Sequence, residues 1–310
     1  MGNLGPLVSV VVPSKNRNEL VSKTIDSILM QTYKNIEIII VDDSSDIPLQ
    51  PMIENKFGKN VFCVRNEHSL GAPASRNIGF SYCAGEFVAF LDDDDLWLPE
   101  KIEKQINEFS NLSSKFGVVY CGYDYLVNEN VVKKNNTYHQ SFNVFIPALG
   151  RCPIGSPTPL IRRSFFDFVG GFDERLCACQ DWDLWIRLSR VCLFFPVKES
   201  LALYRLHGNQ ISTDILKKIS SREAMLYKHK NTLDIYPKIL SKHFEKLGSL
   251  CVLAGKYNKS KMYFWCSVKI YKLNIISWIH LFLKIFSSTF EKLLTERFGV
   301  KKINNIKIYG

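Results

Sequence analysis

Through the first 130 residues, short and nearly uninterrupted apolar runs alternate with longer segments in which apolar residues recur at helical spacing. The apolar runs predict five strands, at residues 7–13, 36–43, 61–66, 86–95 and 116–127. The segments between them predict helices at residues 17–31, 72–83 and 99–110. Strands buried on both faces show no polar alternation, so this pattern predicts an α/β fold with a mostly parallel sheet and helices on both faces.

Two later parts of the chain depart from this alternation. Residues 128–140, NENVVKKNNTYHQ, fit neither pattern and are expected to form a mobile loop. From about residue 216 the pattern becomes helical and rich in Lys, Leu, Ile and aromatic residues. We therefore expect a sheet-containing domain over residues 1–215 and a C-terminal helical extension over residues 216–310.

Charge is distributed unevenly between these two regions. Residues 216–310 hold nineteen Lys and Arg against five Asp and Glu, a net +14, whereas residues 1–215 hold twenty-one against twenty-five, a net −4. The basic region suits an anionic partner, such as nucleic acid or a membrane face. Its longest uncharged stretch, residues 273–283, is too short to span a bilayer. Two interpretations stay open: an amphipathic helix on the anionic inner leaflet, or a helix packed on the first domain.

Cysteine usage and the N-terminal residues bear on the compartment. The nine cysteines are scattered and include no CxxC pair, which argues against a zinc site or a disulfide framework and favours a reducing environment. The first residues, MGNLGPLVSVVVPSKNR, lack the charged region, apolar run and cleavage site of a signal peptide. We expect a cytoplasmic protein, with peripheral contact at the cytoplasmic face of the inner membrane if the basic region lies on lipid.

Three polar clusters stand where predicted strands end. They are PSKNR at 13–17, DDSSD at 42–46 and DDDD at 92–95. Ligands of parallel α/β sheets bind beyond the carboxyl ends of the strands. The three clusters should therefore converge in one crevice.

The run of four carboxylates, Asp92 to Asp95, is the most unusual of these clusters. Adjacent carboxylates repel one another unless a cation is present, and oxygen-rich sites select Mg²⁺ or Mn²⁺. An ion on Asp92 and Asp94 would suit a diphosphate. The alternative is a solvated acidic turn that caps the next helix.

The second cluster and a later glycine-led segment offer further groups for a ligand. Asp42 and Asp43 follow a buried strand, where they suit hydrogen bonds from a nucleobase or ribose, or else form a turn and helix cap. Arg76 lies early in the helix of GAPASRNIGF. It is either a clamp for a phosphate or base edge or an ordinary surface arginine.

In combination, VSVVVPSKNR, IIIVDDSSD, GAPASRNIGF and FVAFLDDDD resemble, in order and spacing, the nucleotide-sugar half of glycosyltransferase family 2, a large inverting family with the Rossmann-like GT-A fold. The resemblance covers about residues 7–212 and implies a catalytic domain over residues 1–215. It implies a Mn²⁺ or Mg²⁺ ion with Asp94 as the direct ligand, assisted by Asp92. The donor nucleotide-binding residues that it implies are Pro13, Ser14, Asn16, Arg17, Asp42, Asp43, Arg76, Asp92 and Asp93.

The second half of the domain supports the resemblance. Residues 155–190 are similar to the family's acceptor segment, where a Glu-Asp pair supplies the catalytic base. In QDWDLW, Gln180 replaces the first acid and Asp181 takes the position of the base, although the same residues also suit the start of an amphipathic helix with its tryptophans in the core. The later LALYRLHGNQIS resembles the family's Tyr-Arg-x-His element. It implies that Arg205 stabilises the leaving diphosphate and that His207 contacts the diphosphate or the metal.

The implied function is that of a metal-dependent inverting glycosyltransferase of the kind that builds bacterial surface polysaccharide, O-antigen (lipopolysaccharide) or capsule. A sugar would move from a nucleoside diphosphate sugar to a hydroxyl group of a glycan or lipid-linked acceptor. UDP is the expected nucleotide, and GDP and dTDP stay open. Asp181 would take the acceptor proton during a single displacement.

Other functional classes fit less well. A non-catalytic nucleotide-sugar or carbohydrate-binding protein of the same fold is the main alternative, suggested by Gln180. Nucleic-acid binding through the basic region is disfavoured, because the first domain is acidic and no recognised binding motif is present. A Rossmann dehydrogenase needs GxGxxG after the first strand, and PSKNRN contains no glycine.

Overall fold

The computed structural model describes residues 5–134, 142–206 and 214–281 of the chain. By internal contacts the chain divides into two units, residues 1–225 and 226–310. The division follows residue 225, whereas the sequence pattern places it after residue 215; helix α8 (Ile215–Lys228) continues across it.

The first elements form close to the predicted bounds, except that β4 ends at Phe90 whereas the predicted strand runs to residue 95. In chain order they are β1 (Val8–Ser14), α1 (Asn18–Leu29), β2 (Ile36–Asp42), α2 (Gln50–Phe57), the 3₁₀ turn η1 (Gly58–Asn60), β3 (Val61–Arg65), α3 (Ala72–Ser81) and β4 (Phe87–Phe90). The sequence pattern misses α2, a short helix in which only Ile53 and Phe57 are buried. Two buried residues in eight give too little periodicity to identify a helix.

The remaining elements of the first unit follow β4 in the chain and include the last strands of the sheet. They are β5 (Leu96–Trp97), α4 (Lys101–Asn111), β6 (Phe116–Val127), β7 (Asn130–Val132), α5 (Phe145–Gly150), β8 (Leu160–Arg162), α6 (Arg163–Val169), α7 (Gln180–Leu188), β9 (Leu193–Arg205) and α8. They include the predicted strand at 116–127 and the predicted helix that begins at QDWDLW.

The expected loop at residues 128–140 is wrong in part, because the chain turns back there as a hairpin. Strand β7 pairs with β6 through Val127 and Asn130, so only Asn128 and Glu129 form the turn. Both have positive φ, at 48° and 62°, as a two-residue type I′ hairpin turn requires. An Asn-Gly pair would have marked this turn in the sequence, whereas Asn-Glu conceals it. Residues 135–141 of the expected loop lie outside the described residues.

The sheet has the strand order β3-β2-β1-β4-β8-β6-β9-β5, with β7 paired to β6. The half formed by β3, β2, β1 and β4 is parallel, and β6 pairs with β9 in parallel as well. Strand β8 runs antiparallel to both β4 and β6, and β5 runs antiparallel to β9. The predicted α/β architecture is therefore confirmed, with a parallel N-terminal half and a mixed second half.

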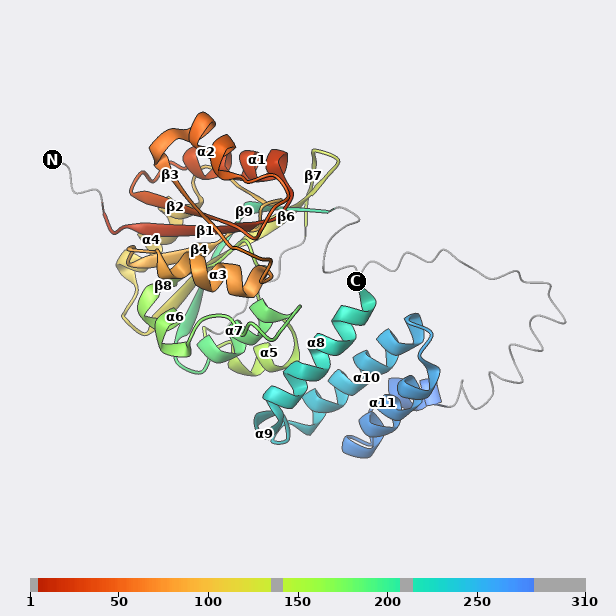
Figure 1. Cartoon of the computed structure of the whole chain (residues 1–310). Coiled ribbons are helices and arrows are strands. Elements are labelled where there is room, and N and C mark those ends of the chain that lie inside the picture. Colours follow the sequence, from red (N-terminus) through yellow and green to blue (C-terminus); the bar gives the residue numbers. More distant parts are fainter. Residues whose placement is uncertain (1–4, 135–141, 207–213, 282–310) are drawn as a thin grey trace. The chain divides into compact units, whose positions relative to one another are not determined.

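Helices cover both faces of the sheet (Figure 1). On one face Val10 and Ile40 pack with apolar residues of α1, α2 and α4. On the other face Val11 and Ile39 pack with residues of α3, α6 and α7. Neighbouring residues of a strand thus enter different cores, which explains why the strand sequences show no polar alternation.

Helix α3 lies unusually close to the sheet, and this closeness depends on Gly79. A β-carbon at that position would collide with the side chains of Val11 and Val41. Because only glycine permits this approach, it fixes the height of α3 above β1 and β2. The helix therefore carries Arg76, one turn earlier, to the carboxyl ends of the strands.

The second unit is helical, as predicted for the C-terminal region. Its helices are α9 (Lys230–Leu233), α10 (Pro237–Leu253) and α11 (Tyr257–Ile270), followed by helical residues 275–281. A buried hydrogen-bond network joins the hydroxyls of Ser241, Ser267 and Ser277 with the amide of Asn274. Over the described part of the chain, helices are either too short or too polar to cross a bilayer.

Candidate functional site

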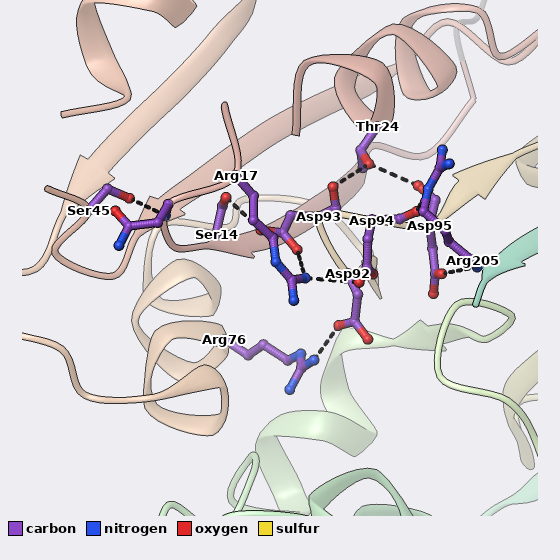
Figure 2. Close-up of polar contacts among 11 residues, drawn as sticks. Ser14, Arg17, Thr24, Ser45, Arg76, Asp92, Asp93, Asp94, Asp95 and Arg205 are labelled. Carbon is purple, nitrogen blue, oxygen red and sulfur yellow. Dashed lines mark hydrogen bonds and ion pairs between the residues drawn. The ribbon is translucent and has the colours of Figure 1, made fainter. Parts of the chain in front are cut away.

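The four carboxylates follow β4 and form a compact corner that we call the acid corner, Asp92 to Asp95 (Figure 2). Asp93, Asp94 and Asp95 are buried, while Asp92 is half-exposed. The hydroxyl of Thr24 lies 3.0 Å from the carbonyl oxygen of Asp93 and 2.9 Å from that of Asp95. Helix α1 therefore holds the backbone of the corner, so its side chains are not those of a solvated turn.

Two arginines offset part of the negative charge. Nη1 of Arg17 donates to Oδ1 of Asp93 at 2.8 Å and to Oδ2 of Asp94 at 2.9 Å, and Arg76 forms an ion pair with Asp92 (Figure 2). The Arg76 guanidinium is buried and lies 5.4 Å from the centre of the Phe172 ring, which adds a cation–π contact. Both arginines, expected to contact the donor, thus also neutralise the acid corner.

Arg205, at the end of β9, supports the same corner from the backbone side. Its main-chain N–H donates to Oδ1 of Asp95 at 2.9 Å, and its Nε donates to the carbonyl oxygen of Asp94 at 2.9 Å. Nη1 pairs with Glu129 at 2.5 Å. The structure places this predicted diphosphate-binding residue beside the acid corner, whereas His207 lies outside the described residues and its role stays a prediction.

The carboxylates nevertheless carry more negative charge than their surroundings accommodate. Burial raises the pKa of Asp93 to about 6, although the charge of Arg17 and the hydroxyl of Ser14 favour its ionised form. Burial raises the pKa of Asp95 well above its usual range, and the neighbouring charges of Asp92 and Asp94 act in the same direction. A site with this excess of buried negative charge favours an additional cation.

The donor atoms present fit a hard divalent cation. Asp92, Asp94 and Asp95 each place a carboxylate oxygen within 4.8 Å of the others. Oδ2 of Asp95 is buried and has no hydrogen-bond partner among the residues that the structure describes. Carboxylate oxygens in such a cluster are the ligands that Mg²⁺ and Mn²⁺ prefer. The predicted ligands Asp92 and Asp94 are thus brought together, and Asp95 joins them.

The first two polar clusters also meet, as predicted, at the ends of β1 and β2. The main-chain N–H of Asn16 donates to the hydroxyl of Ser45 at 2.9 Å, and Oδ1 of Asn16 accepts from the N–H of Asp46 at 2.7 Å. Ser14 Oγ donates to Oδ2 of Asp93 at 2.7 Å, directly after Pro13 at the end of the strand. The expected convergence of the three clusters is therefore confirmed.

Asp42 is buried at the end of β2 and organises the loop that follows. It accepts hydrogen bonds from the main-chain N–H groups of Ser45 and Leu49, at 2.8 and 3.1 Å, and an ion pair from Arg65 at 2.5 Å. Burial alone would raise the pKa of Asp42, but these donors outweigh it and the pKa is lowered. Its carboxylate therefore fixes the conformation of the loop that follows β2.

Asp43 is held even more completely by its own chain. Its carboxylate accepts from the side chains of Asn66 and Ser69 and from the main-chain N–H groups of Leu70 and Gly71, all within 3.0 Å. Burial opposes ionisation, yet these four donors lower the pKa of Asp43 to about 2. A carboxylate offers about four lone-pair positions, so its capacity is already used by the protein. The role of Asp43 in this structure is to hold residues 66–71 in place.

Asp181 lies in the first turn of α7 and is half-buried. Burial raises its pKa, the positive charge of Arg76 lowers it, and the negative charge of Asp92 raises it again. These interactions show that the start of α7 faces the acid corner. Because Cys179 before the helix has positive φ, at 60°, the chain turns sharply to give Asp181 this position.

Gln180 and the buried residues of α7 flank Asp181 in the same helix. Oε1 of Gln180 is buried and accepts no hydrogen bond from the described residues. Trp182 and Trp185 are buried, as predicted for the core face of an amphipathic helix. Asp183 is also buried and pairs with Arg187 at 2.8 Å, so Asp181 is the carboxylate of this helix that is available for chemistry.

Comparisons with known proteins agree with this geometry. The model of the family described as Glycosyl transferase family 2 matches residues 9–166. An uncharacterised glycosyltransferase of Rickettsia typhi is 34% identical over 225 residues, which cover 71% of this chain and 70% of the relative. The Escherichia coli UDP-Glc:α-D-GlcNAc-diphosphoundecaprenol β-1,3-glucosyltransferase WfgD is 29% identical over 225 residues, covering 69% of this chain and 82% of the relative.

Solved structures show the same fold. S. aureus TarS residues 1–349, in complex with UDP-GlcNAc, superposes with a TM-score of 0.57 at 15% identity, covering 85% of this chain and 91% of that chain. The mannosyltransferase PcManGT from Pyrobaculum calidifontis, in complex with GDP-Man and Mn²⁺, gives 0.55 at 14% identity, covering 94% and 81%. With the family match and the Rickettsia relative, these findings show that the chain belongs to glycosyltransferase family 2 and is a glycosyltransferase of the GT-A fold.

Proposed function

We propose that this chain transfers a sugar from a UDP-sugar to a hydroxyl group of a lipid-linked glycan acceptor, with inversion at the anomeric carbon and with a divalent cation. The observation that carries the proposal is that Asp181 lies close enough to the acid corner for Arg76 and Asp92 to affect its pKa. A base on one side and a diphosphate site on the other suit a single displacement. The UDP-sugar donor and diphospholipid acceptor named for the E. coli relative support this choice of substrates.

The residues of the chain divide the chemistry between them. Asp181 would accept the proton of the attacking hydroxyl, and its raised pKa makes it a stronger base than an ordinary aspartate. Asp92, Asp94 and Asp95 would hold the cation, which when bound neutralises charge on the leaving diphosphate. Arg76 and Arg205 add fixed positive charge at the same corner.

Nucleotide binding gives the direct test of the proposed donor. We expect UDP and UDP-sugars to raise the melting temperature in the presence of Mn²⁺, because a ligand that binds only the folded state stabilises it. Without the ion the rise should be much smaller, since the acid corner would then repel the diphosphate. Thermal unfolding with UDP, GDP and dTDP, each with Mn²⁺ or with EDTA, measures this. No shift with any nucleotide under either condition would contradict the proposal. A larger shift with GDP than with UDP would mean that the donor is a GDP-sugar.

The second unit has a surface that suits an anionic membrane. Residues 226–281 hold ten Lys against two Asp and Glu, a net +8. Several apolar side chains of the unit are exposed, among them Trp265, Leu273, Ile275 and Ile276. Lysines beside exposed apolar residues are typical of surfaces that bind the headgroup region of anionic lipids. We propose peripheral binding to the cytoplasmic face of the inner membrane, where a lipid-linked acceptor would be found.

Vesicle binding tests this membrane contact. The full chain should co-sediment with vesicles that contain phosphatidylglycerol and much less with vesicles of phosphatidylcholine alone, and added salt should weaken the binding. Replacing both Ile275 and Ile276 by Ser should reduce binding to the anionic vesicles without changing UDP affinity. Equal recovery with the two kinds of vesicle, or none with either, would argue against a lipid surface as the partner.

A further inference from the structure

Three tyrosines gather toward the ends of β6 and β9. Tyr125 and Tyr204 are register partners of these strands, and Tyr123 lies two residues before Tyr125 on the same face of β6. The ring of Tyr123 lies 5.8 Å from each of the other two, and Tyr125 and Tyr204 are 6.4 Å apart. All three side chains are half-buried, so each leaves part of its ring exposed. We call this group the tyrosine cluster.

A lysine completes the cluster. Nζ of Lys134 lies 3.3 Å from the centre of the Tyr123 ring and 5.7 Å from that of Tyr125. Its main-chain N–H donates to Oδ1 of buried Asp124 at 3.0 Å, which fixes the backbone that carries it. Burial lowers the pKa of Lys134, whereas the charge of Asp124 raises it. The ammonium is thus partly removed from water. An anion that bound beside it would stabilise its charge.

The tyrosine cluster lies beside the candidate base. Sγ of Cys152 is 3.8 Å from Oδ2 of Asp181, and the same cysteine is close enough to Tyr123 and Lys134 to affect the pKa of both. Three residues later, Gly155 lies so close that a β-carbon there would approach the Tyr123 ring to 2.5 Å. The segment 152–155 therefore links the cluster to Asp181.

The cluster also borders the acid corner from the other side. Arg205, which follows Tyr204, donates its main-chain N–H to Asp95 and its Nε to the carbonyl oxygen of Asp94. A molecule lying on the three rings would therefore have Asp181 and the acid corner within its surroundings. This is the geometry required of the second substrate, because its hydroxyl must meet both the base and the donor sugar.

We propose that Tyr123, Tyr125, Tyr204 and Lys134 form the acceptor subsite and that the acceptor they recognise is a sugar carrying a phosphate or diphosphate. Partly exposed aromatic rings present flat apolar surfaces to the C–H face of a sugar, and phenol hydroxyls supply hydrogen bonds at their edges. The ammonium of Lys134 would pair with the phosphate. This inference rests on the proposed function, and it adds the residues that select the acceptor.

Binding of small acceptor probes tests the subsite without knowledge of the natural lipid. The probes are the ethyl diphosphates of GlcNAc, glucose and galactose, with the matching neutral ethyl glycosides, titrated calorimetrically in the presence of UDP and Mn²⁺. At least one sugar diphosphate should bind the wild type more tightly than its neutral partner. Lys134→Gln should weaken that diphosphate by about ten-fold or more, as for the loss of a charged hydrogen bond, and Lys134→Arg should retain most of the affinity.

The tyrosines have a separate signature. Tyr125→Leu should weaken the neutral glycoside and the diphosphate by similar factors, whereas Tyr125→Phe should keep the stacking contribution. UDP affinity should stay unchanged in every variant, which also shows that each is folded. Equal diphosphate binding by the wild type and Lys134→Gln, or no binding of any sugar diphosphate while UDP binds, would overturn the subsite. Failure of UDP to bind the wild type would instead refute the proposed function, and the subsite with it.

Discussion

Replacing Asp181 by Asn should reduce sugar transfer by about 10²- to 10⁴-fold, the contribution typical of a general base. Asparagine keeps the size of the side chain but cannot accept a proton. The carboxylate lies in the first turn of α7, facing Arg76 and Asp92, and it is not used by an ion pair as Asp183 is. The measurement is the rate of UDP release in the presence of acceptor, together with the melting-temperature shift caused by UDP and Mn²⁺, which should be unchanged.

A matched variant separates this effect from a general loss of structure. Asp167 lies on α6, is exposed and forms an ion pair with Arg163 at 3.5 Å, so Asp167→Asn removes one carboxylate that is not among the site residues. Its transfer rate should equal that of the wild type. If Asp181→Asn retained a rate within ten-fold of the wild type, Asp181 would not be the base. The non-catalytic alternative would gain support only if the wild type also bound UDP-sugar without transferring it.

The pH dependence follows from the same residue. A base must be ionised to act, and burial raises the pKa of Asp181 above that of an ordinary aspartate. As the pH is lowered, transfer by the wild type should therefore begin to fall earlier, at a higher pH, than it would with an unperturbed aspartate of pKa 3.8. The small residual rate of Asp181→Asn should not show this decline.

The N-terminal half of the fold can be predicted from the sequence because its strands enter two cores. Val10 and Val11 are adjacent but pack against different sets of helices, so β1 appears as a continuous apolar run that is easily identified. The second half is less readable. Strand β8 has three residues and runs antiparallel between β4 and β6, pairings that bring together segments far apart in the chain. No local pattern specifies such partners or their register.

The candidate site divides in a similar way. Motif order predicts that Ser14, Asn16 and the acid corner meet, because strand ends of a parallel sheet share one edge. It does not show that Asp43 is saturated by four donors, since three of these come from residues 69–71 folding back. Thr24 is also missed. A threonine on the buried stripe of α1, beside Ile25 and Ile28, was the available signal, because a buried hydroxyl needs a partner.

The sequence does not reveal that two arginines form ion pairs with the acid corner. The repulsion within DDDD predicts a cation, and the structure adds Arg17 and Arg76, which belong to segments that precede the acid corner in the sequence. Their ion pairs depend on α3 lying close to the sheet at Gly79 and on the turn after β1. One oxygen of the corner, Oδ2 of Asp95, is buried and still has no partner in the described residues. Asp95 belongs to the cluster formed with Asp92 and Asp94, an arrangement that suits a divalent ion.

Replacing Asp94 by Asn should therefore remove the response to Mn²⁺ and lower transfer by about 100-fold or more, since a bound divalent ion contributes several kcal/mol to such reactions. Asp94 is one of the three carboxylates whose oxygens lie within 4.8 Å of one another. Arg17, which donates to Asp94 in the wild type, would keep its bond to Asp93 in the variant, so the acid corner should stay folded. Calorimetric titration with Mn²⁺, and melting temperature with UDP at several Mn²⁺ concentrations, measure the loss.

Asp93→Asn is the matched comparison, because it changes a neighbouring carboxylate outside the group of three acids that could hold the ion. Asp93 is bound by Ser14 at 2.7 Å and by Arg17 at 2.8 Å, and it is not among the three clustered acids. Its replacement should preserve the Mn²⁺ response, since all three clustered oxygens remain. If Asp93→Asn lost the response and Asp94→Asn kept it, the ion would bind through Asp93 and the cluster assignment would be wrong. If both kept it, the acid corner would be balanced by its arginines alone.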